Sequence, residues 1–257
     1  MTTWDGRVVK SWRKNGVPAC AGAGVGLFPG IEDGLESSGC PTVRSTWKPQ
    51  SFLTNMSDIN PIRVGQSVPD FEMETYDPAT GQFGKLSLAS EKAAGRWTIL
   101  VFYPADFTFV CPTELADLAE KHAALKALGA TVAGVSTDTK FSHLAWRNSE
   151  RLLADVQYTL AADPTGKVAK ALGVYDDASG LALRGTFMIN PSGVLVSSEI
   201  NFYNVGRDAG ELLRKMEANA YLINHPAEAC PARWKPGAKT LAPNEKMVGK
   251  VYEALNG

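Results

Sequence analysis

The sequence predicts an α/β protein built on one sheet that helices cover on both faces. Three observations support this prediction: short runs rich in β-branched and aromatic residues, amphipathic stretches between them, and a clear hairpin pattern late in the series. Strand–helix–strand units place consecutive strands in one sheet, with helices across its faces. At 257 residues with 44% hydrophobic residues, the chain is long enough to bury one sizeable core.

Seven strands are expected, and each is a short run of alternating or continuous apolar residues. In chain order they cover residues 71–76, 83–88, 97–102, 130–136, 158–162, 186–190 and 194–200. Turn-forming residues at 77–81 join the first two strands, and those at 191–193 join the last two into a hairpin. The run over 130–136 is β-branched and contains glycine, which is typical of a parallel core strand.

Helices are expected where apolar residues recur three or four positions apart. They cover residues 115–128, 140–153, 167–172 and 207–224, with a further short helix over 244–255. Thr137 or Asp138 has a side chain suited to capping the helix over 140–153. Because most of these helices follow a strand, they are placed to cover the sheet.

The two ends of the chain differ in character from its middle. Gly, Pro, Ser and Thr recur over residues 1–55 without a sustained pattern, so we expect a disordered extension or a mis-assigned start upstream of Met56. A targeting segment is an alternative, since basic residues over 10–14 precede a mildly apolar stretch, but Gly and Pro interrupt that stretch. The folded domain is expected over 62–224, followed by a tail over 225–257.

Charge and cysteine usage exclude several classes of protein. A net charge of -1 gives no reason to expect binding to nucleic acid or to an anionic membrane. No apolar run approaches the roughly 18 to 20 residues that span a bilayer. The cysteines at positions 20, 40, 111 and 230 form no CxxC pair or zinc-like cluster and are too sparse for a disulfide-rich secreted scaffold. We therefore expect a cytoplasmic protein with one working thiol site, in which Cys20 and Cys40 are inert.

The histidines and glycines offer no cofactor motif. His122, His143 and His225 have no cysteine or acidic partner at metal-ligand spacing, so no metal is expected. His143 is interpreted as a packed or surface histidine near Trp146. The G-x-G-x-x-G fingerprint of a dinucleotide-binding unit does not occur, so this chain is not expected to bind a nicotinamide directly. No other bound cofactor is expected either.

Cys111 is the residue around which the chemistry is expected. It follows the buried strand over 97–102 and a short loop, and it precedes Pro112, which suits the first position of a helix. A thiol at a helix N-terminus lies near unpaired N–H groups and the positive end of the helix dipole, and both favour the thiolate. A buried, inert cysteine is the alternative. The helix start, the proline and the nearby Thr108 favour a reactive thiol.

The pattern Pro104-x-x-x-Thr108-x-x-Cys111 and its surroundings over 102–114 resemble the peroxidatic-cysteine motif of the typical two-cysteine peroxiredoxins. The resemblance runs almost without interruption from about Val64 to Val251. It includes further motifs that begin at Ser136, Phe141, Asp163, Leu183, Gly206 and Glu228. The tail is most similar to bacterial alkyl hydroperoxide reductase C subunits. The resemblance implies a thioredoxin-like fold with peroxiredoxin additions, namely a central mixed sheet flanked by helices, an N-terminal hairpin and an extended C-terminal tail.

The resemblance also implies roles for residues around the thiol. Cys111 is expected to attack a peroxide oxygen and become a sulfenic acid. Arg184 is expected to supply a cation that stabilises the charge developing on the leaving oxygen. Thr108 is expected to place a hydroxyl near the reacting atoms, and Pro104 to shield the sulfur from water. Glu114 is expected to orient Arg184. The alternative is that its carboxylate only stabilises the helix dipole at the start of the helix.

Cys230 resembles the resolving cysteine of the family. A thiol in a mobile tail can condense with a sulfenic acid to give a disulfide. The resemblance implies that Cys230 reacts with Cys111 of another subunit, in a homodimer that assembles further into a decamer. It implies hydroperoxide substrates, including hydrogen peroxide and small organic hydroperoxides, and a role in antioxidant defence. Electrons are expected from an external disulfide reductase, either a flavin-dependent alkyl hydroperoxide reductase subunit or a thioredoxin-like donor.

The sequence departs from the pattern of the over-oxidation-sensitive family members at two places, and two other functions are alternatives to a peroxidase. No Gly-Gly-Leu-Gly insertion lies between Glu150 and Ala162, and the tail carries Tyr252-Glu253 where sensitive relatives carry Tyr-Phe. We therefore expect fast release of the tail and resistance to over-oxidation. A protein thiol–disulfide oxidoreductase is one alternative, which the absence of CxxC at Cys111 disfavours. A redox-sensing or chaperone-like scaffold is the other.

Overall fold

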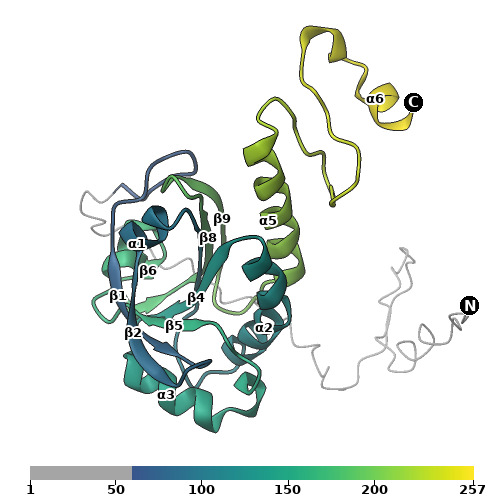
Figure 1. Ribbon diagram of the computed structural model, residues 1–257. Coiled ribbons are helices and arrows are strands. Elements are labelled where there is room, and N and C mark those ends of the chain that lie inside the picture. Colours follow the sequence, from purple (N-terminus) through teal and green to yellow (C-terminus); the bar gives the residue numbers. More distant parts are fainter. Residues whose placement is uncertain (1–59) are drawn as a thin grey trace, which may run out of the picture. The chain divides into compact units, whose positions relative to one another are not determined.

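The computed structural model describes residues 60–257 (Figure 1). Its centre is a seven-stranded mixed sheet of order β2-β1-β5-β4-β3-β8-β9. These strands are β1 (Glu72–Asp77), β2 (Gln82–Ser87), β3 (Trp97–Phe102), β4 (Ala130–Ser136), β5 (Thr159–Ala162), β8 (Arg184–Ile189) and β9 (Leu195–Asn201). A separate small hairpin consists of β6 (Tyr175–Asp176) and β7 (Leu181–Ala182). Strands β3, β4 and β5 are parallel to one another, and the other pairings are antiparallel.

Helices cover the two faces of this sheet. They are α1 (Leu88–Ala93), α2 (Cys111–Ala127), α3 (Lys140–Ser149), α4 (Lys167–Ala171), α5 (Ala209–Asn224) and α6 (Val251–Asn256), with 3-10 turns over Arg151–Leu153 and Glu245–Met247. Strand β3 is buried along its whole length because its alternate side chains enter two different cores. Ile99 belongs to the core that α2, α3 and α5 cover, and Leu100 to the core that α1 and α4 cover. The prediction of one sheet covered on both faces is confirmed.

Several element boundaries differ from the predicted ones. The helix expected over 140–153 ends at Ser149, because Glu150 is extended and its side chain accepts a hydrogen bond from the Leu152 N–H. Thr139, not Thr137 or Asp138, caps its first turn by accepting from Ser142 N. The helix expected over 244–255 is divided into the 3-10 turn and α6. Neither α1 nor the β6–β7 hairpin was predicted. Helix α1 follows β2 with no intervening turn residues, and each strand of the hairpin has only two residues.

The N-terminal ends of α2 and α5 position the residues around Cys111. Helix α2 begins at Cys111, which agrees with the expectation that Pro112 lies in its first turn, although the apolar spacing begins only at Leu115. Helix α5 begins at Ala209, and the Asp208 side chain caps it by accepting from the N–H groups of Gly210 and Glu211. Within residues 60–257 no helix is long and apolar enough to cross a membrane. The expectations for the extension over 1–55, and for Cys20 and Cys40, concern residues outside the described range.

Candidate active site

Cys111 lies where the central strand passes into a helix. Strand β3 ends at Phe102, a loop covers 103–110, and Cys111 is the first residue of α2. Val110 caps this helix without a side-chain hydrogen bond, and Pro112 has no N–H to satisfy. The sulfur therefore lies at the positive end of a long helix, as expected. The Cys111 side chain is fully buried, so it is enclosed by the protein in this conformation.

Arg184 is held against this sulfur. It is the first residue of β8, which pairs with β3, and its side chain is almost completely buried. Its Nη1 donates to the Cys111 Sγ at 3.4 Å and also to a carboxylate oxygen of Glu114, one turn into α2. Its Nε donates to the main-chain oxygen of Tyr203 at 2.8 Å. Its Nη2 makes no hydrogen bond within the described part of the chain, which leaves one donor of the fork unused.

Arg207 completes the charged cluster. Its main-chain N and its Nε donate to Glu114 Oε1 at 2.9 and 2.8 Å, and its Nη1 donates to Thr186 Oγ1 at 3.2 Å. The carboxylate of Glu114 therefore pairs with two buried guanidinium groups. The three side chains carry a net charge of about +1, which one thiolate at Cys111 would balance.

The loop between β3 and α2 has an unusual backbone. Pro104 is buried, and the Thr108 hydroxyl donates to the Ala105 carbonyl at 2.7 Å. Phe107 adopts a positive φ of 56°, which is costly for a bulky residue and indicates a conformation imposed by its surroundings. Phe109 is 93% exposed. Pro104, Thr108, Cys111, Glu114 and Arg184, which the sequence analysis singled out, thus lie on this loop and on the two elements next to it.

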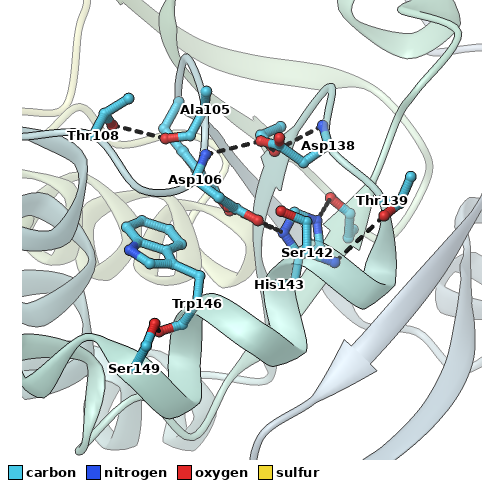
Figure 2. Close-up of polar contacts among 12 residues, drawn as sticks. Ala105, Asp106, Thr108, Asp138, Thr139, Ser142, His143, Trp146 and Ser149 are labelled. Atoms are coloured by element: carbon cyan, nitrogen blue, oxygen red, sulfur yellow. Dashed lines mark hydrogen bonds and ion pairs between the residues drawn. The ribbon is translucent and has the colours of Figure 1, made fainter.

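A buried polar network lies behind the same loop (Figure 2). Asp106 Oδ2 lies 2.9 Å from His143 Nδ1, and its Oδ1 accepts from the Tyr103 hydroxyl at 2.8 Å. The other ring nitrogen of His143 lies 3.2 Å from the Ala161 carbonyl. The Asp106 N–H donates to Asp138 at 2.9 Å. Burial, followed by the charge of Asp106, raises the pKa of Tyr103 well above its usual value, so its hydroxyl stays a donor.

His143 is therefore a packed residue with two hydrogen-bonded ring nitrogens, and not a surface one. It is fully buried on α3, one turn before Trp146, as Figure 2 shows. Trp146 lies under the loop, with its ring 5.7 Å from that of Tyr103 and 6.3 Å from that of Phe107. Within residues 60–257, no group of three or more His, Cys, Asp or Glu residues is arranged to hold a metal ion.

Cys230 lies in the segment after α5 and is partly buried. Main-chain hydrogen bonds between Ala229 and Leu241 close this segment into a loop. Glu228 anchors the loop by accepting from the Tyr221 hydroxyl at 2.8 Å and from the Thr240 hydroxyl. Burial, and then the charge of Glu228, raises the pKa of the Cys230 thiol, while Arg214 opposes the shift. Cys111 and Cys230 are both free thiols.

The sequence analysis missed three contributors to this region. Arg207 lies in the motif that begins at Gly206, but nothing local to it indicates that it reaches Glu114, 93 positions away. The partnership of Asp106 with His143 was missed for the same reason, since 37 residues separate them. Tyr203 acts through its main-chain oxygen, which no sequence motif can indicate.

A mixed sheet that carries a helix-start thiol against a buried arginine defines a thiol-dependent enzyme. Residues 64–198 match the model of the AhpC/TSA family. Alkyl hydroperoxide reductase C of Staphylococcus aureus is 43% identical over 188 residues, which is 73% of this chain and 98% of that protein. The chain therefore belongs to the AhpC/TSA family, and it is a peroxiredoxin, an antioxidant thiol peroxidase.

Solved structures agree with this assignment. AhpC of Enterococcus faecalis is 42% identical, with a TM-score of 0.61 over 65% of this chain and 98% of its own. The reduced 2-Cys peroxiredoxin of Plasmodium vivax is 30% identical, with a TM-score of 0.68 over 72% of this chain and 96% of its own. The predicted thioredoxin-like fold and the predicted enzyme class are confirmed.

Proposed function

We propose that Cys111 is the peroxidatic thiol that reduces hydrogen peroxide and small organic hydroperoxides. The observation that supports this most directly is the contact of 3.4 Å between Arg184 Nη1 and the Cys111 sulfur at the start of α2. The thiolate attacks the terminal oxygen of the hydroperoxide, and the O–O bond breaks. The sulfur is oxidised to a sulfenic acid, while the alkoxide or hydroxide leaves and takes a proton to become alcohol or water.

The charged cluster stabilises this step. Arg184 favours the thiolate through Nη1 and directs its unused Nη2 donor to the charge that develops on the leaving oxygen. Glu114 keeps the guanidinium of Arg184 from rotating away from the sulfur, because this buried carboxylate binds Arg184 and is itself held by Arg207. The Thr108 hydroxyl orients the peroxide, and buried Pro104 keeps bulk water from the sulfur.

Cys230 is proposed as the resolving thiol. Its thiolate attacks the Cys111 sulfenic acid of a second subunit, which forms the disulfide and releases hydroxide. Because the Cys111 side chain is fully buried, the first turn of α2 has to unwind before the two sulfurs meet. An external disulfide reductase in the cytoplasm, either flavin-dependent or thioredoxin-like, then restores both thiols.

Two surfaces support assembly into a homodimer and further into a decamer. Strand β9 is an edge of the sheet in the described part of the chain, where its first residue, Leu195, exchanges main-chain hydrogen bonds with residues 65 and 66, and where Ile200 and the following Phe202 are exposed. A second copy could extend the sheet there. Phe107 and Phe109 are both exposed on the loop before α2, and exposed apolar side chains of this kind commonly mark interfaces.

Steady-state peroxide consumption with dithiothreitol as reductant tests the proposal. Wild type should turn over, Cys111→Ser should not, and Cys230→Ser should form a dimedone-trappable sulfenate without a disulfide-linked dimer on non-reducing gels. Cys40→Ser is the matched control and should behave as wild type. Turnover by Cys111→Ser would refute the assignment. Disulfide exchange with protein substrates, or suppression of aggregation without peroxide turnover, would favour the oxidoreductase or chaperone alternatives.

A further inference from the structure

The small β6–β7 hairpin has no part in the chemistry proposed above, yet it carries an ordered polar cluster. The carboxylate of Asp176 accepts from the Ser179 hydroxyl at 2.7 Å and from the Ala178 N–H at 3.0 Å. Its Oδ2 also accepts from the Tyr203 hydroxyl at 2.7 Å, and Ser179 lies 3.0 Å from the same hydroxyl. The first two contacts belong to the turn itself, whereas the contacts to Tyr203 reach across to another segment.

Tyr203 connects this cluster to the site through its main chain. Its carbonyl oxygen accepts from the Arg184 Nε at 2.8 Å, while its side chain is held at Asp176. Arg184 in turn follows β7 by two positions. The hairpin is therefore connected to the guanidinium of Arg184 in two ways, covalently along the chain and through the hydrogen bonds of Tyr203.

The segment that carries Tyr203 needs such an anchor. Residues 202–206 follow β9 without forming a helix or strand, and the neighbouring Phe202 and Val205 are largely exposed. Arg207 fixes the far end of this segment on Glu114. Among residues 202–206, the only side-chain hydrogen bonds found in the described part of the chain are those of the Tyr203 hydroxyl to the hairpin.

Fixing Nε matters because it sets the orientation of the guanidinium. The two Nη1 contacts hold the planar group at one corner only, and the contact at Nε holds it at a second corner, so that it cannot tilt about Nη1. The direction of the unused Nη2 donor then depends on where the Tyr203 carbonyl is held. A donor that has to meet a developing charge is effective only when it is already oriented.

We propose that Tyr203 is a positioning residue for Arg184 in the peroxidase reaction, and that Asp176 and Ser179 of the hairpin hold it in place. This inference rests on the proposed role of Arg184. The hydroxyl of Tyr203 touches no reacting atom and acts only through its own main-chain oxygen. The hairpin thus serves as a support for the active-site cation.

The test compares two reactions of Cys111 in the Cys230→Ser background, so that the disulfide cannot form. Stopped-flow Trp fluorescence measures oxidation by hydrogen peroxide, and mass spectrometry measures alkylation by iodoacetamide, which requires the thiolate but no O–O cleavage. Tyr203→Phe removes one hydroxyl and should slow oxidation roughly 3- to 10-fold, the expected effect of one lost hydrogen bond. Alkylation should slow less. Asp176→Asn should act in the same direction, and Tyr252→Phe, on the exposed tail helix, should leave both rates unchanged.

A double variant separates this inference from the role of Arg184. Arg184→Lys alone should slow oxidation strongly, and Tyr203→Phe should add less than a further 2-fold to it, because lysine has no Nε donor for the Tyr203 carbonyl. If Arg184→Lys has no effect, the proposed function fails. If Arg184→Lys slows oxidation but Tyr203→Phe and Asp176→Asn do not, the positioning role fails. A fall in melting temperature with both rates preserved assigns Tyr203 a purely structural role and also overturns the inference.

Discussion

Glu114 and Arg184 lie 70 positions apart in the chain and form a buried ion pair in the first turn of α2. The same carboxylate binds Arg207, so a single negative charge holds two cations in the interior. Loss of one partner from a buried pair costs much more than the pair contributes, because the remaining charge is left without compensation. Removal of either partner should therefore destabilise the fold and disturb the electrostatics of the thiol.

Replacing Glu114 by Gln keeps the shape of the side chain but removes its charge. We expect a loss of about 3–5 kcal/mol in the free energy of unfolding, because two buried guanidinium groups lose their counter-charge. Urea unfolding measures this. Glu120→Gln on the exposed face of the same helix is the control and should change stability by no more than about 0.5 kcal/mol. A loss below about 1 kcal/mol for Glu114→Gln contradicts the argument.

Disulfide formation should depend on pH through Cys230. Burial and the charge of Glu228 raise the pKa of this thiol above its usual value of 9.0, so at neutral pH only a small fraction is thiolate. The rate of the second step should therefore rise about tenfold per pH unit up to that pKa. Glu228→Gln should move the profile to lower pH and speed resolution near pH 7.

Rapid-quench gels of the disulfide-linked dimer, taken from pH 6 to 10, give this profile. Glu245→Gln, in the same tail but exposed, should leave it in place. An unchanged profile in Glu228→Gln would show that Glu228 does not control the thiol. A rate that falls with rising pH would show that a different group limits the step.

The fold followed from the sequence where local patterns are strong. The strands over 97–102 and 130–136 lie at their predicted bounds, because each is an almost continuously buried run that a glycine precedes by one or two positions. The start of α2 was indicated by Pro112 alone, because the apolar spacing begins at Leu115 and Val110 caps the helix without a polar side chain. The end of α3 was placed too late because Glu150 leaves helical geometry while its neighbours keep the apolar spacing.

The site was only partly predictable for a physical reason. Cys111 is recognisable from its own neighbours, since a thiol before a proline at a helix start is a local feature. The identification of Arg184 depended on family resemblance, and its contacts to Glu114 and Tyr203 are contacts between distant segments. Periodicity and spacing describe which face a residue occupies and not which residue it meets across the core.

The C-terminal tail should detach quickly enough for Cys230 to reach Cys111 before Cys111 is over-oxidised. Helix α6 contains no buried residue, and Tyr252 on it is 76% exposed, so little packing holds the end of the chain. A sulfenic acid that meets Cys230 soon is not oxidised further. After repeated turnover at millimolar peroxide, mass spectrometry should find Cys111 mainly as disulfide in wild type. It should find sulfinate in Cys230→Ser, and ready accumulation of sulfinate in wild type would contradict this prediction.

His143 should be necessary for the loop that precedes Cys111. Its replacement by Leu removes the partner of the Asp106 carboxylate in a site that is closed to water, and should cost about 3–5 kcal/mol of stability. Because Asp106 lies on that loop, Trp146 beneath it should also change its fluorescence in the folded state. His225→Gln, at the exposed end of α5, is the control and should change neither property much. Retention of wild-type stability in His143→Leu would show that Asp106 does not depend on the imidazole.

The domain boundaries proposed from the sequence predict that residues 1–55 are dispensable. The family match begins at residue 64, and the related Staphylococcus aureus protein is covered over 98% of its length by 73% of this chain. A variant that begins at Met56 should therefore keep the peroxide turnover and melting temperature of the full chain, since the described core contains only later residues. Intact-mass analysis of the protein from its native source shows whether the extension is retained. A loss of turnover in the shortened variant, restored when the extension is present, would instead give residues 1–55 a role in the enzyme.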